Sequence, residues 1–430
     1  MAPPGGPSSH GGRAVEEWRM AFRRDTALLF ATRSVRLFAY GLFSVVLVLH
    51  LAAAGLSEAR IGLLLSLTLL GDTALSLWIT TRADRAGRRR MLLLGAALMV
   101  AAGLLFAATR DFWLLLFAAT LGIISPAGNE VGPFLAIEQA ALSQALPDSG
   151  RTRAFAWYAL AGSVATALGS LAGGSLAAGL QRTGAEPLAA YRAVALAYAA
   201  LGAVLLVLFT RLSPGAEAPG RSAGRPAFLA PGLGLSRSRG VVARLSGLFA
   251  VDAFAGGFVV QSFVAFWFHR RFGLEEQWLG ALFFGANLLA GLSALAAGWI
   301  AGRIGLVNTM VLTHLPSNVL LLLVPLMPTL PLAAGVLLLR FSISQMDVPT
   351  RQSYTMAVVD PAERSAAAGV TGIARTVGSS LAPLAAGPLY ASAALSGVPF
   401  LVGGGLKIVY DLLLWRSFRR LRPPEERAAP

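Results

Sequence analysis

The stretch "TTRADRAGRRRM", residues 80–91, places six charged side chains at the junction of two long apolar runs. These runs extend over residues 60–81 and 91–109. Because about 20 consecutive apolar residues are enough to cross a bilayer, the arrangement predicts two membrane helices joined by a charged turn. Asp84 is the one acid in this turn, and Gly87 permits a tight turn or a positive φ.

The composition of the whole chain agrees with a membrane protein. Hydrophobic residues make up 56% of the sequence, charged residues 13%, and the mean hydropathy is +0.66. Soluble domains contain about 25% charged residues, so the deficit of charge is the informative difference. The absence of cysteine excludes disulfides and thiol catalysis. Four scattered histidines argue against a metal site, so we expect neither a metal nor a cofactor.

Further apolar runs follow the same pattern along the chain. They predict an all-α integral membrane protein with twelve transmembrane helices, at residues 27–54, 60–81, 91–109, 112–145, 153–180, 188–210, 243–268, 277–301, 306–327, 331–358, 364–392 and 397–417. The fourth run is longer than a bilayer requires, so we expect it to be tilted, kinked or protruding.

The arginines gather in every second connection between these runs. If the N-terminus is cytoplasmic, the cytoplasmic segments hold most of them, which is the positive-inside pattern. The net charge of +15 then reflects topology and contact with anionic membrane lipids, not nucleic-acid binding. We therefore predict a multi-pass protein of the cell membrane with both termini in the cytoplasm.

Polar segments divide the chain into two halves. We expect a disordered cytoplasmic tail at 1–26, a six-helix bundle at 27–210, a basic cytoplasmic linker at 211–242, a second six-helix bundle at 243–418 and a cytoplasmic tail at 419–430. The halves resemble each other: "GLSEARIG" (55–62) matches "GLEEQWLG" (273–280), and "ADRAG" (83–87) matches "AGRIG" (301–305). Two pseudo-symmetric repeats around a midplane site are a transporter architecture.

The stretch 80–91 also resembles the cytoplasmic loop signature of the major facilitator superfamily, G-x-x-x-D-R-x-G-R-R/K, with Thr80 in place of the first glycine. The resemblance implies the twelve-helix fold of that superfamily and a gating loop made by Asp84, Arg85, Gly87 and Arg88. The alternative for the arginines is that they only follow the positive-inside rule. In the fifth run, "GSLAGG" (169–174) partly resembles a glycine pattern of proton-exchanging exporters, with Ser170 in place of proline.

Three carboxyl groups lie near the middle of their predicted helices: Asp72, Glu130 and Asp347. Burial favours the protonated form of a carboxyl group, so each is a candidate proton carrier. Glu130 has no charged neighbour within one helical turn and is the first candidate; a permanent ion pair with Arg33 or Arg36 is its alternative. Asp72 has a helix–helix hydrogen bond as its alternative, and Asp347 an ion pair with Arg351, four residues along the same face.

Most intramembrane charges fall on the first, fourth, seventh and tenth runs, which line the central cavity in the superfamily. Candidate cavity residues are Arg33, Arg36, Asn129, Glu138, Asp252, Gln261, Arg351, Gln352 and Tyr354. On one continuous helix Glu138 would lie about 12 Å from Glu130 toward the cytoplasm. Lys407 and Asp411, on the last run, are assigned a structural role.

The sequence thus predicts a secondary active transporter of a small solute, working by alternating access as a monomer. Proton coupling is favoured over sodium coupling because buried single carboxyl groups outnumber any oxygen-rich cluster, and export is slightly favoured over import. Alternatives are an uptake carrier for a metabolite and a non-transporting sensor or scaffold. Loops without cysteine and poor in histidine offer no catalytic constellation, so we expect no enzyme activity.

Overall fold

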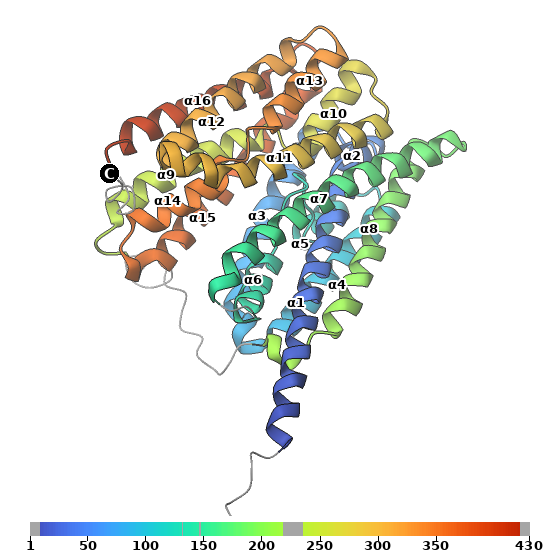
Figure 1. Cartoon of the computed structure of the whole chain (residues 1–430). Coiled ribbons are helices and arrows are strands. Elements are labelled where there is room, and N and C mark those ends of the chain that lie inside the picture. The colour runs from blue at the N-terminus through green and yellow to red at the C-terminus, as the bar shows by residue number, and fades with distance from the viewer. Residues whose placement is uncertain (1–8, 131, 146–147, 218–234, 422–430) are drawn as a thin grey trace, which may run out of the picture.

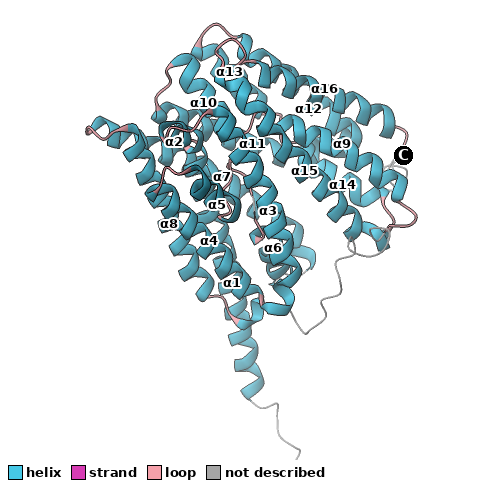
Figure 2. Ribbon diagram, turned by 180° about the vertical axis from the view of Figure 1, so that it is seen from behind, coloured by secondary structure: helices cyan, strands magenta, loops and turns pink. Residues whose placement is uncertain are grey.

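The computed structural model describes residues 9–130, 132–145, 148–217 and 235–421, and within these residues it contains helices, turns and loops but no strand (Figure 2). The helices of the first half are α1 (Ser9–Ser44), α2 (Leu47–Ala53), α3 (Glu58–Ala86), α4 (Arg88–Ala108), α5 (Phe112–Leu121), α6 (Phe134–Ala145), α7 (Asp148–Arg182) and α8 (Pro187–Thr210). Those of the second half are α9 (Arg239–Gly257), α10 (Gln261–Phe272), α11 (Glu276–Ile304), α12 (Leu306–Leu323), α13 (Leu330–Phe341), α14 (Asp347–Val358), α15 (Arg364–Ala391) and α16 (Val398–Phe418). Short 3₁₀ turns lie at η1 (Pro214–Ala216), η4 (Val324–Leu326) and η5 (Pro361–Glu363).

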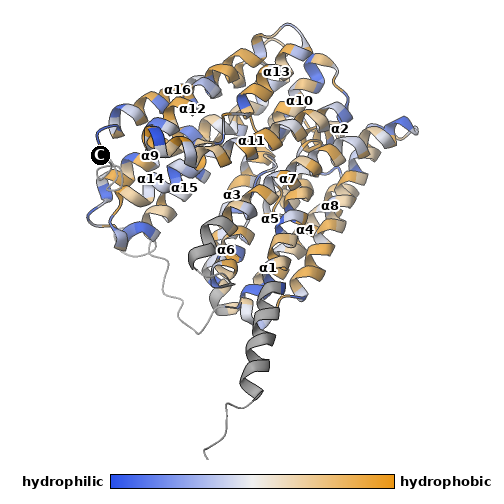
Figure 3. Ribbon diagram, in the orientation of Figure 1, coloured by the Kyte–Doolittle hydropathy of each residue, from blue (hydrophilic) through white to orange (hydrophobic). Residues whose placement is uncertain are grey.

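The described helices correspond to the twelve predicted spans. Eight spans contain helices long and apolar enough to cross a membrane, and α1 with α2, bent by 43°, gives a ninth. The remaining predicted spans are the broken pairs α5–α6 and α13–α14, and the helix α15. In most of the coloured helices apolar residues predominate, and many of the polar residues lie near the helix ends (Figure 3). Large apolar side chains such as Trp113 and Leu312 are exposed, as expected for surfaces that contact lipid.

Local sequence signals set the helix boundaries. Ser57 and Asp111 precede α3 and α5, and their side chains accept hydrogen bonds from the backbone N–H groups of Arg60 and Leu114. Gly87 ends α3 with a φ of 99°, which confirms the predicted tight turn, and Gly305 has a φ of 84° between α11 and α12. The same turn at the same place in both halves supports the internal repeat.

The N-terminus differs from its prediction. Residues 1–26 were expected to form a disordered tail, but α1 begins at Ser9, and only residues 1–8 lie outside the described part of the chain there. The segment 13–22, "RAVEEWRMAF", is rich in Ala, Glu, Arg and Met, which have high helix propensity. This propensity allows the helix to extend beyond its membrane-spanning part.

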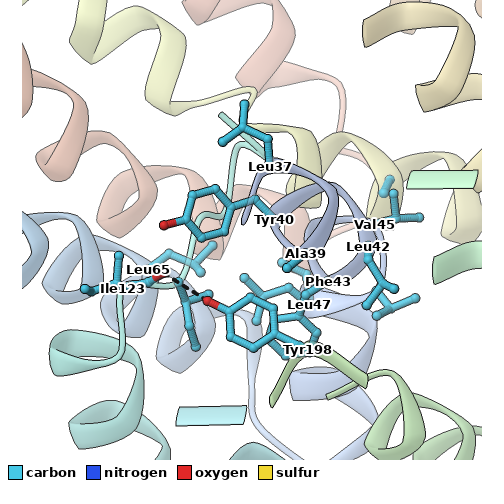
Figure 4. Packing of buried hydrophobic residues seen from close by; sticks show 14 of the residues in the cluster. Leu37, Ala39, Tyr40, Leu42, Phe43, Val45, Leu47, Leu65, Ile123 and Tyr198 are labelled. Carbon is cyan, nitrogen blue, oxygen red and sulfur yellow. Dashed lines mark hydrogen bonds between the residues drawn. The ribbon is translucent and has the colours of Figure 1, made fainter. Parts of the chain in front are cut away.

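The fourth span is broken rather than continuous. The helix stops at Leu121 and resumes at Phe134, because Pro126 and Pro133 remove hydrogen-bond donors within the intervening segment. Ile123 adopts the left-handed conformation with φ 54°, which is strained for a β-branched residue. The Tyr198 hydroxyl of α8 donates a 3.0 Å hydrogen bond to the Ile123 carbonyl (Figure 4). A side chain of another span thus holds the break in place.

The two bundles meet at one end and diverge at the other (Figure 1). We call the end with the start of α1, η1, the start of α9 and the end of α16 the linker end, and the end with α2 and α10 the opposite end. Near the opposite end, α3 packs on α15 so closely that a Cβ at Gly62 would lie 2.3 Å from the Pro383 carbonyl oxygen. Helices α7 and α11 pack in the same way at Gly174 and Gly280.

Candidate functional site: a charged cavity between the two halves

A cavity of about 560 Å³ lies between the halves. The first half contributes side chains from α1, from α7 and from the break in the fourth span, and the second half contributes side chains from α9 to α16. Its charged lining residues are Arg33, Glu130, Asp252, Arg340, Asp347, Arg351, Arg375 and Lys407, with His314 beside them. Charges are costly inside a membrane unless they are paired or face water, so this concentration marks the site.

The N-half cluster consists of Arg33, Arg36, Glu130 and Glu138. Arg33 Nη1 lies 2.7 Å from Glu130 Oε2, and Arg36 Nη2 lies 2.8 Å from Glu130 Oε1. Arg36 also binds Glu138 in a bidentate manner, with both N···O distances 2.8 Å. The Tyr158 hydroxyl donates a further hydrogen bond of 2.5 Å to Glu138. Arg33 and Glu130 line the cavity, whereas Arg36 and Glu138 are fully buried behind its wall.

This geometry changes the interpretation of the two glutamates. A continuous helix would separate them along its axis, but the break between α5 and α6 lets both carboxylates reach the same guanidinium of Arg36. The prediction that they lie about 12 Å apart along one helix is therefore wrong. Glu130 forms the ion pairs with Arg33 and Arg36 that were the alternative to its role as a proton carrier.

The C-half cluster consists of Asp252, Asp347, Arg351, Arg375 and Lys407. Asp252 of α9 lies at its centre: Lys407 Nζ is 2.5 Å, Arg351 Nη1 3.1 Å and Arg375 Nη1 3.8 Å from its oxygens. Arg351 also pairs with Asp347, one turn earlier on α14, at 2.9 Å. The last span, assigned a structural role from the sequence, thus contributes Lys407 to the wall of the cavity.

A buried group behind this cluster was not anticipated from the sequence. His314 of α12 lines the cavity, and its Nδ1 lies 2.8 Å from Asp411 Oδ1 of α16. Asn318, one turn further along α12, donates a 2.9 Å hydrogen bond to the other oxygen of Asp411. The sequence feature that could have indicated this group is a histidine in the middle of an apolar span. Its partner is 97 positions away in the sequence.

The first helices of the two halves contribute opposite charges to the clusters. In the first half, the first span supplies arginines and the fourth span supplies glutamates. In the second half, the equivalent first helix α9 supplies the acid Asp252, and α14 supplies Arg351. The charge of α9 is therefore opposite to that of α1, whereas α14 carries both a base, Arg351, and an acid, Asp347. A solute in the cavity would therefore contact both signs of charge.

A polar layer connects the halves beyond the cavity. Gln261, at the start of α10, donates a 2.8 Å hydrogen bond to Ser44 at the end of α1 and accepts one of 3.0 Å from Asn287 of α11. The backbone N–H of Ser262 donates to the carbonyl of Pro126 in the break of the fourth span, at 3.1 Å. Nearer the opposite end, Arg270 of α10 and Glu58 of α3 form an ion pair of 2.7 Å. These contacts hold the halves together on one side of the cavity.

The remaining predicted site residues lie in different places. Asn129 lines the cavity beside Glu130. Asp72 of α3 is buried behind the break of the fourth span, and its Oδ1 has no hydrogen-bond partner among the described residues. Gln352 is exposed outside the cavity, since it lies one position beyond the inward-facing Arg351 on α14. Tyr354 is buried against Phe418 and donates to the backbone of Leu421, away from the cavity.

The charged loop at 80–91 has an acidic partner outside the loop itself. Glu217, just after η1, accepts hydrogen bonds from the backbone N–H groups of Arg88 (2.6 Å) and Arg89 (3.2 Å) at the start of α4. The Arg88 guanidinium donates to Gln144 at the end of α6, at 2.9 Å. The side chains of the two other predicted gating residues, Asp84 and Arg85, lie outside the described part of the structure.

Comparison with known proteins agrees with this architecture. The family model of the Major Facilitator Superfamily matches residues 29–383. The chain belongs to this superfamily. It is therefore a multi-pass membrane protein with the twelve-helix fold of secondary transporters, as the loop motif and the repeat predicted.

Individual relatives extend this assignment. The chain is 33% identical over 419 residues to the uncharacterized membrane protein YJR124C of Saccharomyces cerevisiae, covering 91% of this chain and 93% of the yeast protein. It resembles a bacterial homolog of the human lysosomal transporter Spinster, in an inward-facing and occupied conformation, with a TM-score of 0.72, 15% identity and coverage of 92% and 97%. A D-xylose–proton symporter gives a TM-score of 0.69, 15% identity and coverage of 91% and 97%.

Proposed function

We propose that this superfamily member carries a small solute across the cell membrane by alternating access, as a monomer, with the linker end in the cytoplasm. The observation that carries the proposal is the charged cavity between two repeated bundles that are joined on one side of it. A rocking motion of one bundle against the other would expose the same clusters to the other side. The cytoplasmic assignment rests on the arginine-rich connections of that end.

We further propose that transport is coupled to protons, with Asp72 as the carrier. Of the three predicted carriers, Glu130 and Asp347 form ion pairs, while in the described part of the structure Asp72 has no cation within 4.0 Å. A buried carboxyl group without a cation is least costly when it is protonated. A Cβ at Gly132 would lie 3.7 Å from Asp72 Oδ1, so the acid adjoins the break that carries Glu130. Protonation of Asp72 would thus change the electrostatic environment of the break, which forms part of the cavity wall.

The direction we propose is export, in exchange for protons. The partial glycine pattern at 169–174 supports this choice, and the proton symporter among the structural neighbours shares only the fold at 15% identity. Uptake is the competing direction. Proteoliposomes with an imposed pH gradient distinguish the two, because an exporter accumulates solute on the acidic side and a proton symporter on the alkaline side.

Flux measurements combined with labelling test the transport proposal. The chain has no cysteine, so Asn129→Cys gives a single label in the cavity. Ser365→Cys at the exposed start of α15 gives the control outside it. We expect a membrane-impermeant maleimide to label Asn129→Cys from the linker side, and substrate or a pH gradient to shift labelling to the opposite side. Labelling that never changes sides, with no flux of any solute in a broad panel, would refute the proposal.

The proton carrier has its own experiment. We expect Asp72→Asn to abolish accumulation driven by a pH gradient while solute exchange continues. Asp111→Asn is the matched control, because Asp111 is an exposed cap of α5 and asparagine caps helices equally well. Accumulation that persists in Asp72→Asn would exclude this role and return Glu130 to first place.

A further inference from the structure

The cavity carries more positive than negative charge. Five cationic side chains line it, Arg33, Arg340, Arg351, Arg375 and Lys407, against the three carboxylates Glu130, Asp252 and Asp347. All three carboxylates already form ion pairs with these cations or with Arg36. Behind the wall, Arg36 pairs with Glu138, and Asp411 contacts His314 and Asn318. The excess of cations is therefore located at the cavity surface.

Of the five cations that line the cavity, Arg340 forms no ion pair with a carboxylate among the described residues. It lies at the end of α13, and among the described residues no carboxylate oxygen is within 4.0 Å of its guanidinium. Its Nε atom is buried and has no hydrogen-bond partner in the described structure. Its guanidinium carbon lies 4.9 Å from the ring centroid of its neighbour Phe341. A guanidinium in this state inside a membrane protein lacks the counter-charge that would offset its desolvation.

Arg375 of α15 is only partly neutralised. Its contact with Asp252 is 3.8 Å long, beyond hydrogen-bond distance, and Asp252 already accepts hydrogen bonds from Lys407 and Arg351. The Nη1 atom of Arg375 is buried without a hydrogen-bond partner among the described residues, while 36% of the side chain remains exposed. Arg375 therefore lines the cavity with a partly exposed side chain and with one donor that has no partner in the described structure.

We propose that the cavity binds a small organic anion and that Arg340 and Arg375 are its principal binding residues. This inference rests on the proposed transport function. The planar guanidinium offers paired donors that match the oxygens of a carboxylate or a phosphate. A volume of about 560 Å³ suits a metabolite-sized molecule. Apolar lining residues such as Leu37, Val264 and Leu337 would contact the carbon part of the ligand.

Equilibrium binding to the purified full chain tests the inference without requiring transport. Thermal unfolding is followed in neutral detergent at constant ionic strength with four probes: succinate, inorganic phosphate, glucose and choline. We expect succinate or phosphate to raise the melting temperature in a saturable manner, and glucose and choline to have no effect. Stabilisation by glucose or choline with none by the anions would overturn the inference. So would stabilisation by added phosphatidylglycerol alone, which would assign the arginines to a lipid headgroup.

Variants connect the binding to the two arginines. We expect Arg340→Gln and Arg375→Gln each to weaken anion binding at least about tenfold, and Arg340→Lys to weaken it less because the charge is retained. Arg416→Gln, at an exposed position of α16, is the control and should bind like the original chain. If one glutamine variant fails to fold, the anion affinity of the other tests the inference. Unchanged anion affinity in both would overturn the inference. Transport of a neutral solute would overturn it while leaving the transport proposal intact.

Discussion

Arg36→Met removes the guanidinium that joins the two glutamates of the N-half cluster. Arg36 is 0% exposed and donates hydrogen bonds to Glu130 at 2.9 Å and to both oxygens of Glu138 at 2.8 Å. In the variant, Glu130 keeps its ion pair with Arg33, but Glu138 becomes a fully buried carboxylate without a cation. Removing one partner of a buried ion pair costs about 3–5 kcal/mol.

The structure indicates where in this range the loss of unfolding free energy should lie. Tyr158 and Thr32 still donate hydrogen bonds to Glu138 in the variant, so we expect a loss near the lower limit, about 3 kcal/mol of unfolding free energy. Combining Arg36→Met with Glu138→Gln removes the unpaired charge. The double variant should therefore be more stable than the sum of the two single losses by roughly 1.5 kcal/mol or more.

Equilibrium unfolding in mixed detergent micelles, followed by circular dichroism, measures these differences. Arg416→Met is the matched control, because Arg416 is an exposed arginine of α16. If Arg36→Met unfolds like Arg416→Met, or if the two losses at Arg36 and Glu138 simply add, then Arg36 does not hold a buried charge pair and the account of the N-half cluster is refuted.

Three further predictions concern other parts of the molecule. A Cβ at Gly387 would lie 2.4 Å from the Glu58 carbonyl oxygen. Gly387→Ala should therefore disfavour closure of the opposite end and increase maleimide labelling of Asn129→Cys from that side roughly tenfold. Gly372→Ala is the control, because a Cβ at Gly372 would meet no atom within 4 Å. Glu217→Ala should destabilise the start of α4 by about 1 kcal/mol, as measured by thermal unfolding, whereas Glu186→Ala at the uncapped start of α8 should not. Hydrogen bonds from the Ser236 hydroxyl and from backbone N–H groups lower the pKa of Glu363 from 4.5 to about 2. The stability that these hydrogen bonds supply is present above about pH 4.5 and is lost as the pH falls toward 2. The unfolding free energy of Glu363→Gln should lack this loss between about pH 4.5 and 2.

The fold was predictable because it depends on patterns that are local in the sequence. Apolar runs determine the spans, and the glycine at 87 recurs at 305, also with a positive φ. The break of the fourth span was only partly predictable. Its prolines indicated a weakened helix, but the extent of the break depends on Tyr198 of another span, which holds the Ile123 carbonyl.

The site was less predictable because its pairings join distant positions. Sequence patterns identified Glu130 and Arg36 as intramembrane charges, but their contact spans 94 positions. Similarly, the acidic partner of the charged loop is Glu217, 129 positions from Arg88. A single sequence does not show which distant residues are in contact. The ion pairs of Glu130 could therefore be given only as the alternative to its role as a proton carrier.

Distances between spin labels at both ends of the molecule test alternating access most directly. One pair joins Thr183→Cys and Ala393→Cys at the opposite end, and the other joins Arg24→Cys and Ser365→Cys at the linker end; all four positions are exposed. When substrate or a change of pH is applied, we predict that the first distance lengthens while the second shortens. Two distances that stay fixed, or that change in the same sense, in a protein that supports flux would contradict alternating access.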